Sequence, residues 1–293
     1  MSITRRKLLH AFGSLGIGAA LTGAASKPEQ QTTSQLDRKL GNTDLSISPV
    51  GFGAEHTRDP DLIRYALDQG INHIETAWAY GFGKSGNSCE CIGKAIKGKR
   101  DSVHLLVAYH GDAPRTSGAW VANQFEQTLR DLRTDYIDVF LWHQPKGVEM
   151  ITEGENVEVM EKWKTQGKIR WCGITAHQDQ ELYLDHLATS SIYNVAVVAF
   201  NYKSPPELAK AIEIAAQKGV GIIAMKTQSP DYMRPDKPTI GDAPDHKRAL
   251  TWVLSQSSVT AAIPGMTTRE QVDLNMQVMN AVSSKPASRS SQL

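Results

Sequence analysis

The sequence is short of several features that define whole classes of protein. It holds 3 cysteines among 293 residues, an odd number that argues against a disulfide framework. It lacks any run of about 18 apolar residues, which is the length that a membrane-spanning helix needs. Its net charge is only +1, so the basic excess typical of a nucleic-acid binder is missing. With 40% hydrophobic and 22% charged residues, the composition is that of a globular protein.

The first 26 residues differ in kind from the rest. A cationic start with Arg5, Arg6 and Lys7 precedes a weakly apolar stretch rich in Gly and Ala, over residues 11–25. This order is typical of an export signal, and the arginine pair followed by two leucines is similar to a twin-arginine signal, which engages a machinery for folded proteins. An ordinary amphipathic helix is the alternative. Signal removal would change the net charge from +1 to −2 and leave no stably membrane-inserted segment, so we expect an exported, periplasmic protein.

Composition also divides the remaining chain. Residues 27–36 are polar and predict a loose tether, and residues 283–293 form a serine-rich tail that can bury little. Residues 37–282 carry the alternating apolar segments of one folded domain. Cys89 and Cys91 lie one residue apart, without the two-residue spacer of common zinc sites, so we interpret both, and Cys172, as structural.

Short apolar segments alternate with longer segments of helical periodicity between the tether and the tail. The short segments predict buried strands at 50–54, 73–77, 103–109, 136–143, 169–175, 195–200, 221–226 and 260–264. The longer ones predict helices at 60–69, 89–96, 119–132, 157–165, 180–188, 206–217, 246–254 and from about 268. Strands that are each followed by a helix close most simply into a (β/α)8 TIM barrel of the α/β class. An open doubly wound sheet is the alternative, but the turn at 51–54 lacks the third glycine of a dinucleotide-binding turn.

The C-terminal ends of the strands form the active face of such a barrel. Polar and aromatic side chains gather there: His56, Glu75, Tyr80, His110, His143, Thr175, His177, Phe200, Asn201 and Lys226. Four of the nine histidines fall on this rim, which favours catalysis over scattered structural roles. The segment 226–245 has four prolines and no periodicity, and it predicts a lid over the site or a flexible loop.

Seven sequence segments occur in the same order as the motifs of a known protein family. They are RKLGNTDLSISPVGFG (38–53), GINHIETAWAYG (70–81), DYIDVFLWHQP (135–145), GKIRWCGITAH (167–177), VVAFN (197–201), GIIAMK (221–226) and AIPGMTTREQVDLN (262–275). Together they resemble the aldo-keto reductase superfamily, and the first is similar to its N-terminal β-hairpin and first strand. The resemblance implies a TIM barrel with an N-terminal β-hairpin that binds NADP or NAD.

The resemblance also implies catalytic roles. Tyr80 matches the proton donor to a substrate carbonyl, and His143 matches the histidine that orients this carbonyl. Because a phenol has an ordinary pKa near 10, the family lowers it with a lysine that an aspartate holds. Here Glu75 stands at the aspartate position, and the lysine position falls on Ala108, or on Tyr109 if the alignment slips by one. Without this cation we expect weaker proton transfer from Tyr80.

The cofactor site that the resemblance implies is recognisable but altered. We expect Phe200 to stack on the nicotinamide and Thr175 to lie beside its carboxamide. The other candidate cofactor-binding residues are Lys226, Gly265, Thr267, Thr268, Arg269, Gln271 and Asn275. Gly265 and Gln271 replace the lysine and arginine that many relatives place around the 2′-phosphate of NADP, so NADP and NAD both stay open.

Three functional hypotheses follow. The first is an exported aldo-keto-reductase-like oxidoreductase, which reduces a carbonyl or oxidises an alcohol on a small substrate such as a sugar derivative, with Tyr80, His143 and Glu75 as catalytic residues. The second is a non-redox lyase, isomerase or hydrolase. It could use a metal ion, for which donor atoms are present on His56, Glu75, His110, His143 and His177. The third is a binding protein without catalysis. All three expect a small-molecule ligand and no nucleic acid.

Overall fold

The computed structural model describes residues 36–81, 87–110, 118–228 and 243–283. The predicted export signal, nearly all of the tether and of the tail, and most of the predicted lid lie outside these residues.

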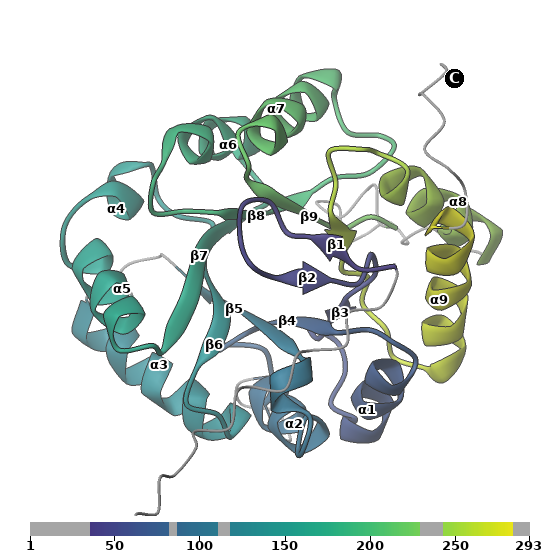
Figure 1. The fold of residues 1–293 in the computed structure, drawn as a ribbon, viewed down its shortest axis with the longest axis horizontal. Helices are drawn as coiled ribbons and strands as arrows, with labels where there is room; N and C mark the ends of the chain where they lie inside the picture. The colour runs from purple at the N-terminus through teal and green to yellow at the C-terminus, as the bar shows by residue number, and fades with distance from the viewer. Residues whose placement is uncertain (1–35, 82–86, 111–117, 229–242, 284–293) are drawn as a thin grey trace, which may run out of the picture. The chain divides into compact units, whose positions relative to one another are not determined.

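Eight parallel strands form the barrel, and each pairs with the next along the chain (Figure 1). They are β3 (Phe52–Gly53), β4 (His73–Ala77), β5 (His104–His110), β6 (Ile137–His143), β7 (Ile169–Ala176), β8 (Val195–Ala199), β9 (Gly221–Met225) and β10 (Ala261–Ala262). Two isolated bridges, Val50 to Ala262 and Gly53 to Gly265, join the first strand to the last. The predicted (β/α)8 barrel is therefore confirmed.

The seam between β3 and β10 explains why these two strands are shorter than the sequence predicts. Each has only 2 residues in regular pairing. Pro49 and Pro264 flank the seam, and a proline interrupts a ladder because it lacks a backbone N–H. Their carbonyls still accept hydrogen bonds, from the backbone N–H of Ala262 (2.9 Å) and of Gly53 (3.1 Å). A few bonds therefore close the sheet where a full ladder cannot form.

Helices surround the strands, as Figure 1 shows. They are α1 (Pro60–Asp68), α2 (Ser88–Ala95), α3 (Gly118–Leu132), α4 (Glu149–Thr152), α5 (Glu155–Thr165), α6 (Gln180–Thr189), α7 (Pro206–Gln217), α8 (Ala243–Leu254) and α9 (Arg269–Ser283), with a 3₁₀ turn at Arg100–Ser102. Only α4 was not predicted, because a single turn is too short to show a helical period. Within the described ranges, no helix is both long and apolar enough to cross a membrane.

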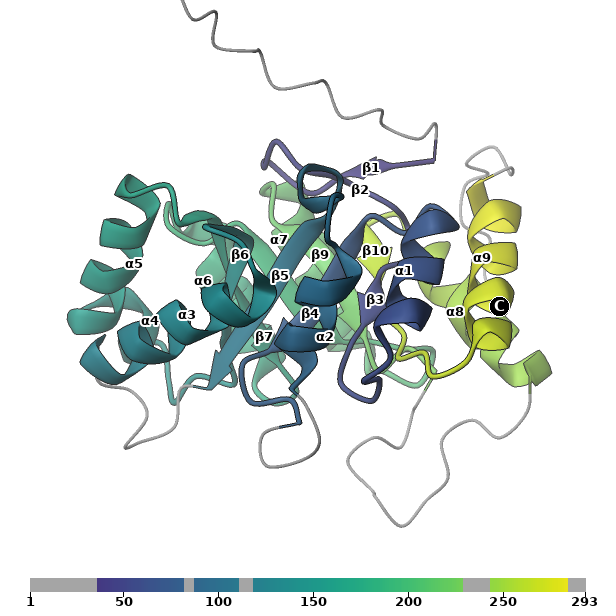
Figure 2. The ribbon, with the colours of Figure 1, turned by 90° about the horizontal axis from the view of Figure 1, so that it is seen from below.

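A β-hairpin covers one end of the barrel, as the resemblance implied. Its strands, β1 (Arg38–Lys39) and β2 (Ser46–Ile47), lie over one end of the barrel strands (Figure 2). Leu40, Leu45 and Ile47 of the hairpin are at most 1% exposed and belong to the same buried cluster as inward-facing strand residues such as Val139 and Val195. The hairpin thus closes the N-terminal end of the barrel and leaves the opposite end for the site.

A buried carboxylate ties the strands together near the hairpin. Asp138 of β6 is 1% exposed, and its two oxygens lie 2.9 Å from an Arg100 nitrogen and 2.7 Å from an Arg170 nitrogen. Arg170 also reaches Asp44 of the hairpin at 2.7 Å. Burial alone would raise the pKa of Asp138, but a hydrogen bond with His104 and the charge of Arg100 outweigh it and lower the pKa to about 2.

We expect Asp138→Asn to destabilise the protein by about 3 kcal/mol at pH 7, because it leaves two arginines beside a neutral group. A carboxyl whose pKa is lowered by folding stabilises the protein above its unfolded pKa, about 3.9, and this contribution disappears as the pH falls towards the folded pKa. The difference in free energy of unfolding should therefore shrink at pH 3, measured by urea titration. Exposed Asp135→Asn is the control, expected within about 0.5 kcal/mol of wild type. A difference that stays constant with pH would contradict this assignment.

Candidate functional site

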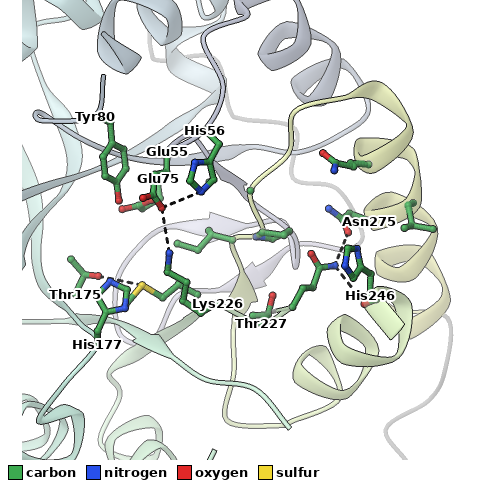
Figure 3. A pocket seen from close by; sticks show the side chains of 18 of the residues that line it. Glu55, His56, Glu75, Tyr80, Thr175, His177, Lys226, Thr227, His246 and Asn275 are labelled. Carbon is green, nitrogen blue, oxygen red and sulfur yellow. Dashed lines mark hydrogen bonds and ion pairs between the residues drawn. The ribbon is translucent and has the colours of Figure 1, made fainter. Parts of the chain in front are cut away.

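One cavity opens at the C-terminal ends of the strands, and Figure 3 shows its side chains. Its described lining comprises Gly53, Glu55, His56, Glu75, Tyr80, His143, Thr175, His177, Met225, Lys226, Thr227, Gln228, His246, Ile263, Pro264, Gly265, Gln271, Leu274 and Asn275. The three predicted catalytic residues therefore share one cavity with several of the predicted cofactor-binding residues. The cavity continues from the strand ends to the start of α9.

Tyr80 is positioned by the turn that follows β4. Its backbone N–H donates to the carbonyl of Ala77 (3.1 Å), and its own carbonyl accepts from Ser88 of α2 (3.0 Å). Its side chain packs on the inward-facing cluster, with the hydroxyl directed towards the carboxylates of Glu55 and Glu75 in Figure 3. The negative charge of Glu75, then burial and then the charge of Glu55 raise the pKa of Tyr80 above its ordinary value.

Glu75 lies deep in the cavity, 7% exposed, on β4. Its backbone is fixed because its carbonyl accepts from Ala54 (2.9 Å) and it pairs in register with Gly53 of β3. Burial and the neighbouring Glu55 raise the pKa of Glu75 to about 8, although the positive charge of Lys226 partly offsets them. At neutral pH the carboxyl of Glu75 is therefore mostly protonated and can donate a proton as well as accept one.

The side chain that β5 presents to Tyr80 is a methyl group. Alternate residues of a strand face opposite sides, and Ala108 lies in the inward-facing cluster that Tyr80 contacts, whereas Tyr109 lies in the outer cluster. The ring of Tyr109 stacks on Phe140 with centroids 4.8 Å apart. Of the two positions that the sequence left open for the missing lysine, Ala108 is thus the one that faces the site.

A lysine does enter the cavity, but from another strand. Lys226 follows β9, and its ammonium lies 3.3 Å from an oxygen of Glu55. Its backbone adopts a left-handed conformation (φ 53°), and its carbonyl accepts from the side chain of Asn201 at 3.3 Å. The family resemblance implied a role for Lys226 at the cofactor, and it gave no role to Glu55. The position of Glu55, directly after a predicted strand, was the signal that could have identified it.

The predicted rim histidines have different surroundings. The rings of His143 and His177 meet edge to face, with centroids 5.5 Å apart. Burial and the charge of Lys226 lower the pKa of His177 to about 4, despite the attraction of Glu55, so His177 is neutral at pH 7. His56 is exposed, and the side chain of His110 lies outside the described part of the chain.

The metal site that the sequence left as an alternative is not supported. Among the described residues there is no group of three or more His, Cys, Asp or Glu side chains that could hold a metal ion.

Some of the candidate cofactor residues around the start of α9 line the cavity, and others do not. Gln271 lines the cavity and its side-chain oxygen accepts from the backbone N–H of Thr267 (2.7 Å), while the hydroxyl of Thr268 accepts from the backbone N–H of Gln271 (3.3 Å). Arg269 lies over the ring of Tyr65, 4.8 Å from its centroid. Thr267, Thr268 and Arg269 are therefore outside the described lining, whereas Gly265, Gln271 and Asn275 are part of it.

Phe200 does not lie where the resemblance implied. It is 2% exposed and packs against Trp252 of α8 with ring centroids 5.2 Å apart, away from the cavity lining. The period of β8 explains this, because Val197 and Ala199 face inward and the next residue along the chain faces the helices. Met225 lines the cavity instead, and its sulfur is 3.8 Å from the hydroxyl of Thr175.

A barrel closed at its N-terminal end, with titratable side chains gathered at the other, defines the class of (β/α)8 enzymes. The Aldo/keto reductase family model matches residues 54–229, so the chain belongs to the aldo/keto reductase family, which comprises oxidoreductases.

Individual relatives agree with this assignment. The chain is similar to the aldo-keto reductase YhdN of Bacillus subtilis (40% identity over 162 residues), an alignment that spans only 46% of this chain and 45% of that protein. It is 24% identical to the L-galactose dehydrogenase of Arabidopsis thaliana, over 84% of this chain and 89% of that protein. A solved aldo/keto reductase from Klebsiella pneumoniae, in complex with NADP and acetate, shares the fold with a TM-score of 0.67 and 23% identity, over 80% of this chain and 87% of that one.

Proposed function

We propose that the protein catalyses NAD(P)H-dependent reduction of a carbonyl, or the reverse oxidation of an alcohol, on a small, sugar-like substrate. One observation carries this proposal: a single cavity is lined both by Tyr80, Glu75 and His143 and by Gly265 and Asn275 near α9. The first group can handle a proton, and the second can hold a nucleotide. Carbonyl reduction requires a proton donor and a bound nucleotide, and one cavity has residues for both.

The residues present fit a dinucleotide. The hydroxyl of Thr227 is buried without a hydrogen-bond partner, although it belongs to the lining of the cavity, so it is ready to bind a polar group there. The amide of Gln228 donates to the side chain of Asn275 at 3.3 Å, so these two polar side chains of the cavity could bind an adenosine. Met225 offers a polarisable surface for an aromatic ring. A similar barrel in Klebsiella pneumoniae holds NADP, which supports this fit.

The chain's own residues account for the proton transfers. A bound reduced nicotinamide supplies hydride to the carbonyl carbon of the substrate. Tyr80 donates a proton to the oxygen, because its hydroxyl projects into the cavity and stays protonated. His143, at the end of β6, orients the carbonyl by a hydrogen bond. Glu75, which is buried in the same cavity, is the acidic group next to Tyr80 that supports its proton transfer.

The lining also suits a polyhydroxylated substrate. Glu55, His177, Thr175 and Lys226 offer hydrogen-bond donors and acceptors around one opening, where a sugar could exchange its water contacts for protein contacts. Similarity to a protein named L-galactose dehydrogenase supports this class of substrate.

We expect Met225→Ala to weaken binding of NADH or NADPH by roughly 2- to 10-fold, through loss of a sulfur–aromatic contact. Phe200→Leu should leave the dissociation constant unchanged and lower stability by about 1 kcal/mol, because Phe200 packs in the outer core. Titration of intrinsic fluorescence with each nucleotide measures the dissociation constants of both variants and also decides between NAD and NADP. Weaker binding in Phe200→Leu alone would reverse the two assignments.

We expect Tyr80→Phe to lower kcat for reduction of an aldose or other carbonyl by about 10²- to 10⁴-fold, with nucleotide binding retained, since only the proton donor is removed. Tyr136→Phe is the control, because Tyr136 lies under Arg100 at the opposite end of the strands. Nucleotide oxidation followed by absorbance measures the rate. Turnover retained in Tyr80→Phe would exclude Tyr80 as the donor.

We also propose that the chain is exported to the periplasm by the twin-arginine machinery, on the basis of Arg5 and Arg6 before an apolar stretch. The double variant Arg5→Lys, Arg6→Lys keeps the charge but removes the pair, so the protein should accumulate in the cytoplasm. Fractionation of cells followed by immunoblotting checks this. Unchanged periplasmic protein would overturn the proposed route.

A further inference from the structure

An ion pair crosses the mouth of the cavity above Glu75. One oxygen of Glu55 lies 3.3 Å from the ammonium of Lys226 and 3.7 Å from Nε2 of His56. The side chains of Glu55 and Lys226 are 43% and 29% exposed, so the pair has access to solvent, whereas Glu75 is 7% exposed. The two groups come from β3 and β9, on either side of the barrel seam. The pair is therefore the more solvent-accessible part, and Glu75 the more buried part, of one cavity.

The charges around Glu75 come from several strand ends. The titratable groups that share its cavity are Glu55 and His56 after β3, Tyr80 after β4, His143 of β6, His177 after β7 and Lys226 after β9, with His246 of α8 further along. From β5 the facing side chain is the methyl of Ala108. Glu55 raises the pKa of Glu75, and Lys226 lowers it.

Tyr80 has a different electrostatic environment. Burial and the negative charge of Glu55, together with that of Glu75 once it is ionised, raise the pKa of Tyr80, so it stays a neutral phenol. Once Tyr80 has given up its proton, the resulting phenolate is unfavourable in this buried, negatively charged environment until another acid replaces the proton. Glu75 is the acid towards which the hydroxyl of Tyr80 is directed (Figure 3).

We propose that Glu75 stores the proton that the reaction consumes, and that the Glu55–Lys226 pair sets how firmly Glu75 holds it. This inference rests on the proposed carbonyl reduction. A bound reduced nicotinamide dinucleotide would supply hydride to the carbonyl carbon, which would leave the π electrons of the C=O bond on the oxygen. Tyr80 gives its hydroxyl proton to that oxygen, and Glu75 gives its carboxyl proton to Tyr80. Solvent then reprotonates Glu75 past the ion pair, so the net change is carbonyl plus NAD(P)H plus H⁺ to alcohol plus NAD(P)⁺.

The first test needs neither cofactor nor substrate. Carbon-13 NMR of protein labelled at the glutamate side-chain carboxyl follows the titration of Glu75, with the resonance assigned by its absence in Glu75→Gln. Loss of the cation in Lys226→Met should raise the titration midpoint, and loss of the anion in Glu55→Gln should lower it, each by roughly 0.5–1 pH unit. Lys226→Arg keeps the charge and should titrate like wild type.

The second test is the pH profile of kcat for reduction. Because the protonated carboxyl is the active form, kcat should fall above the Glu75 midpoint. This fall should move to higher pH in Lys226→Met and to lower pH in Glu55→Gln, with Lys226→Arg again at the wild-type position. A merely structural role would change kcat or KM at every pH without displacing the profile.

Several results would overturn the inference. Midpoints that do not move in opposite directions would show that the ion pair does not act on Glu75, and a Glu75 midpoint below pH 5 would show that no proton is stored there. Opposite NMR shifts without matching shifts in kcat would remove Glu75 from the proton path. A wild-type protein that shows the NMR shifts but never oxidises NAD(P)H would instead refute the proposed reaction, and the catalytic part of the inference with it.

Discussion

Closure of the parallel sheet is the constraint on which the site depends. Two isolated bridges and a few hydrogen bonds beside Pro49 and Pro264 join β3 to β10. Without this seam, Glu55 and Lys226 would end on opposite edges of an open sheet and could not meet at 3.3 Å. The hairpin covers the other end with apolar side chains, so the cavity opens where the strands end. A seam of few hydrogen bonds thus holds together the two sides of the cavity.

Electrostatics distinguishes this site from the arrangement that the family resemblance implied. The side chain that faces Tyr80 from β5 is Ala108, and the cation of the cavity is Lys226, which sits beside two carboxylates. The pKa of Glu75 rises to about 8 because burial and Glu55 outweigh Lys226. Of Glu75 and Tyr80, the carboxyl is therefore the group with the pKa nearer to neutral pH. The site keeps a tyrosine and a histidine in the expected places but surrounds them with different charges.

Much of the architecture could be predicted from local patterns. Alternation of apolar strands with amphipathic helices identified the barrel, and strand-end positions predicted that Tyr80, Glu75 and His143 lie together, because parallel strands end on one face. The side chain of Phe200 packs in the outer core, because one residue further along a strand moves a side chain from the barrel interior to the opposite face. Met225 and Thr227, which do line the cavity, carry no sequence pattern that distinguishes them from core residues.

The sequence by itself determined the class of fold, the family and the set of chemical groups available, since these follow from periodicity and from motifs in a fixed order. It also determined that no lysine stands at the expected place on β5. Only the tertiary structure decided that Ala108 rather than Tyr109 faces Tyr80, that Lys226 pairs with Glu55, and that the side chain of Phe200 packs in the outer core. The physical reason is that pairing across 171 residues of sequence, and the resulting burial of charge, depend on sheet register and barrel closure, which no local pattern encodes.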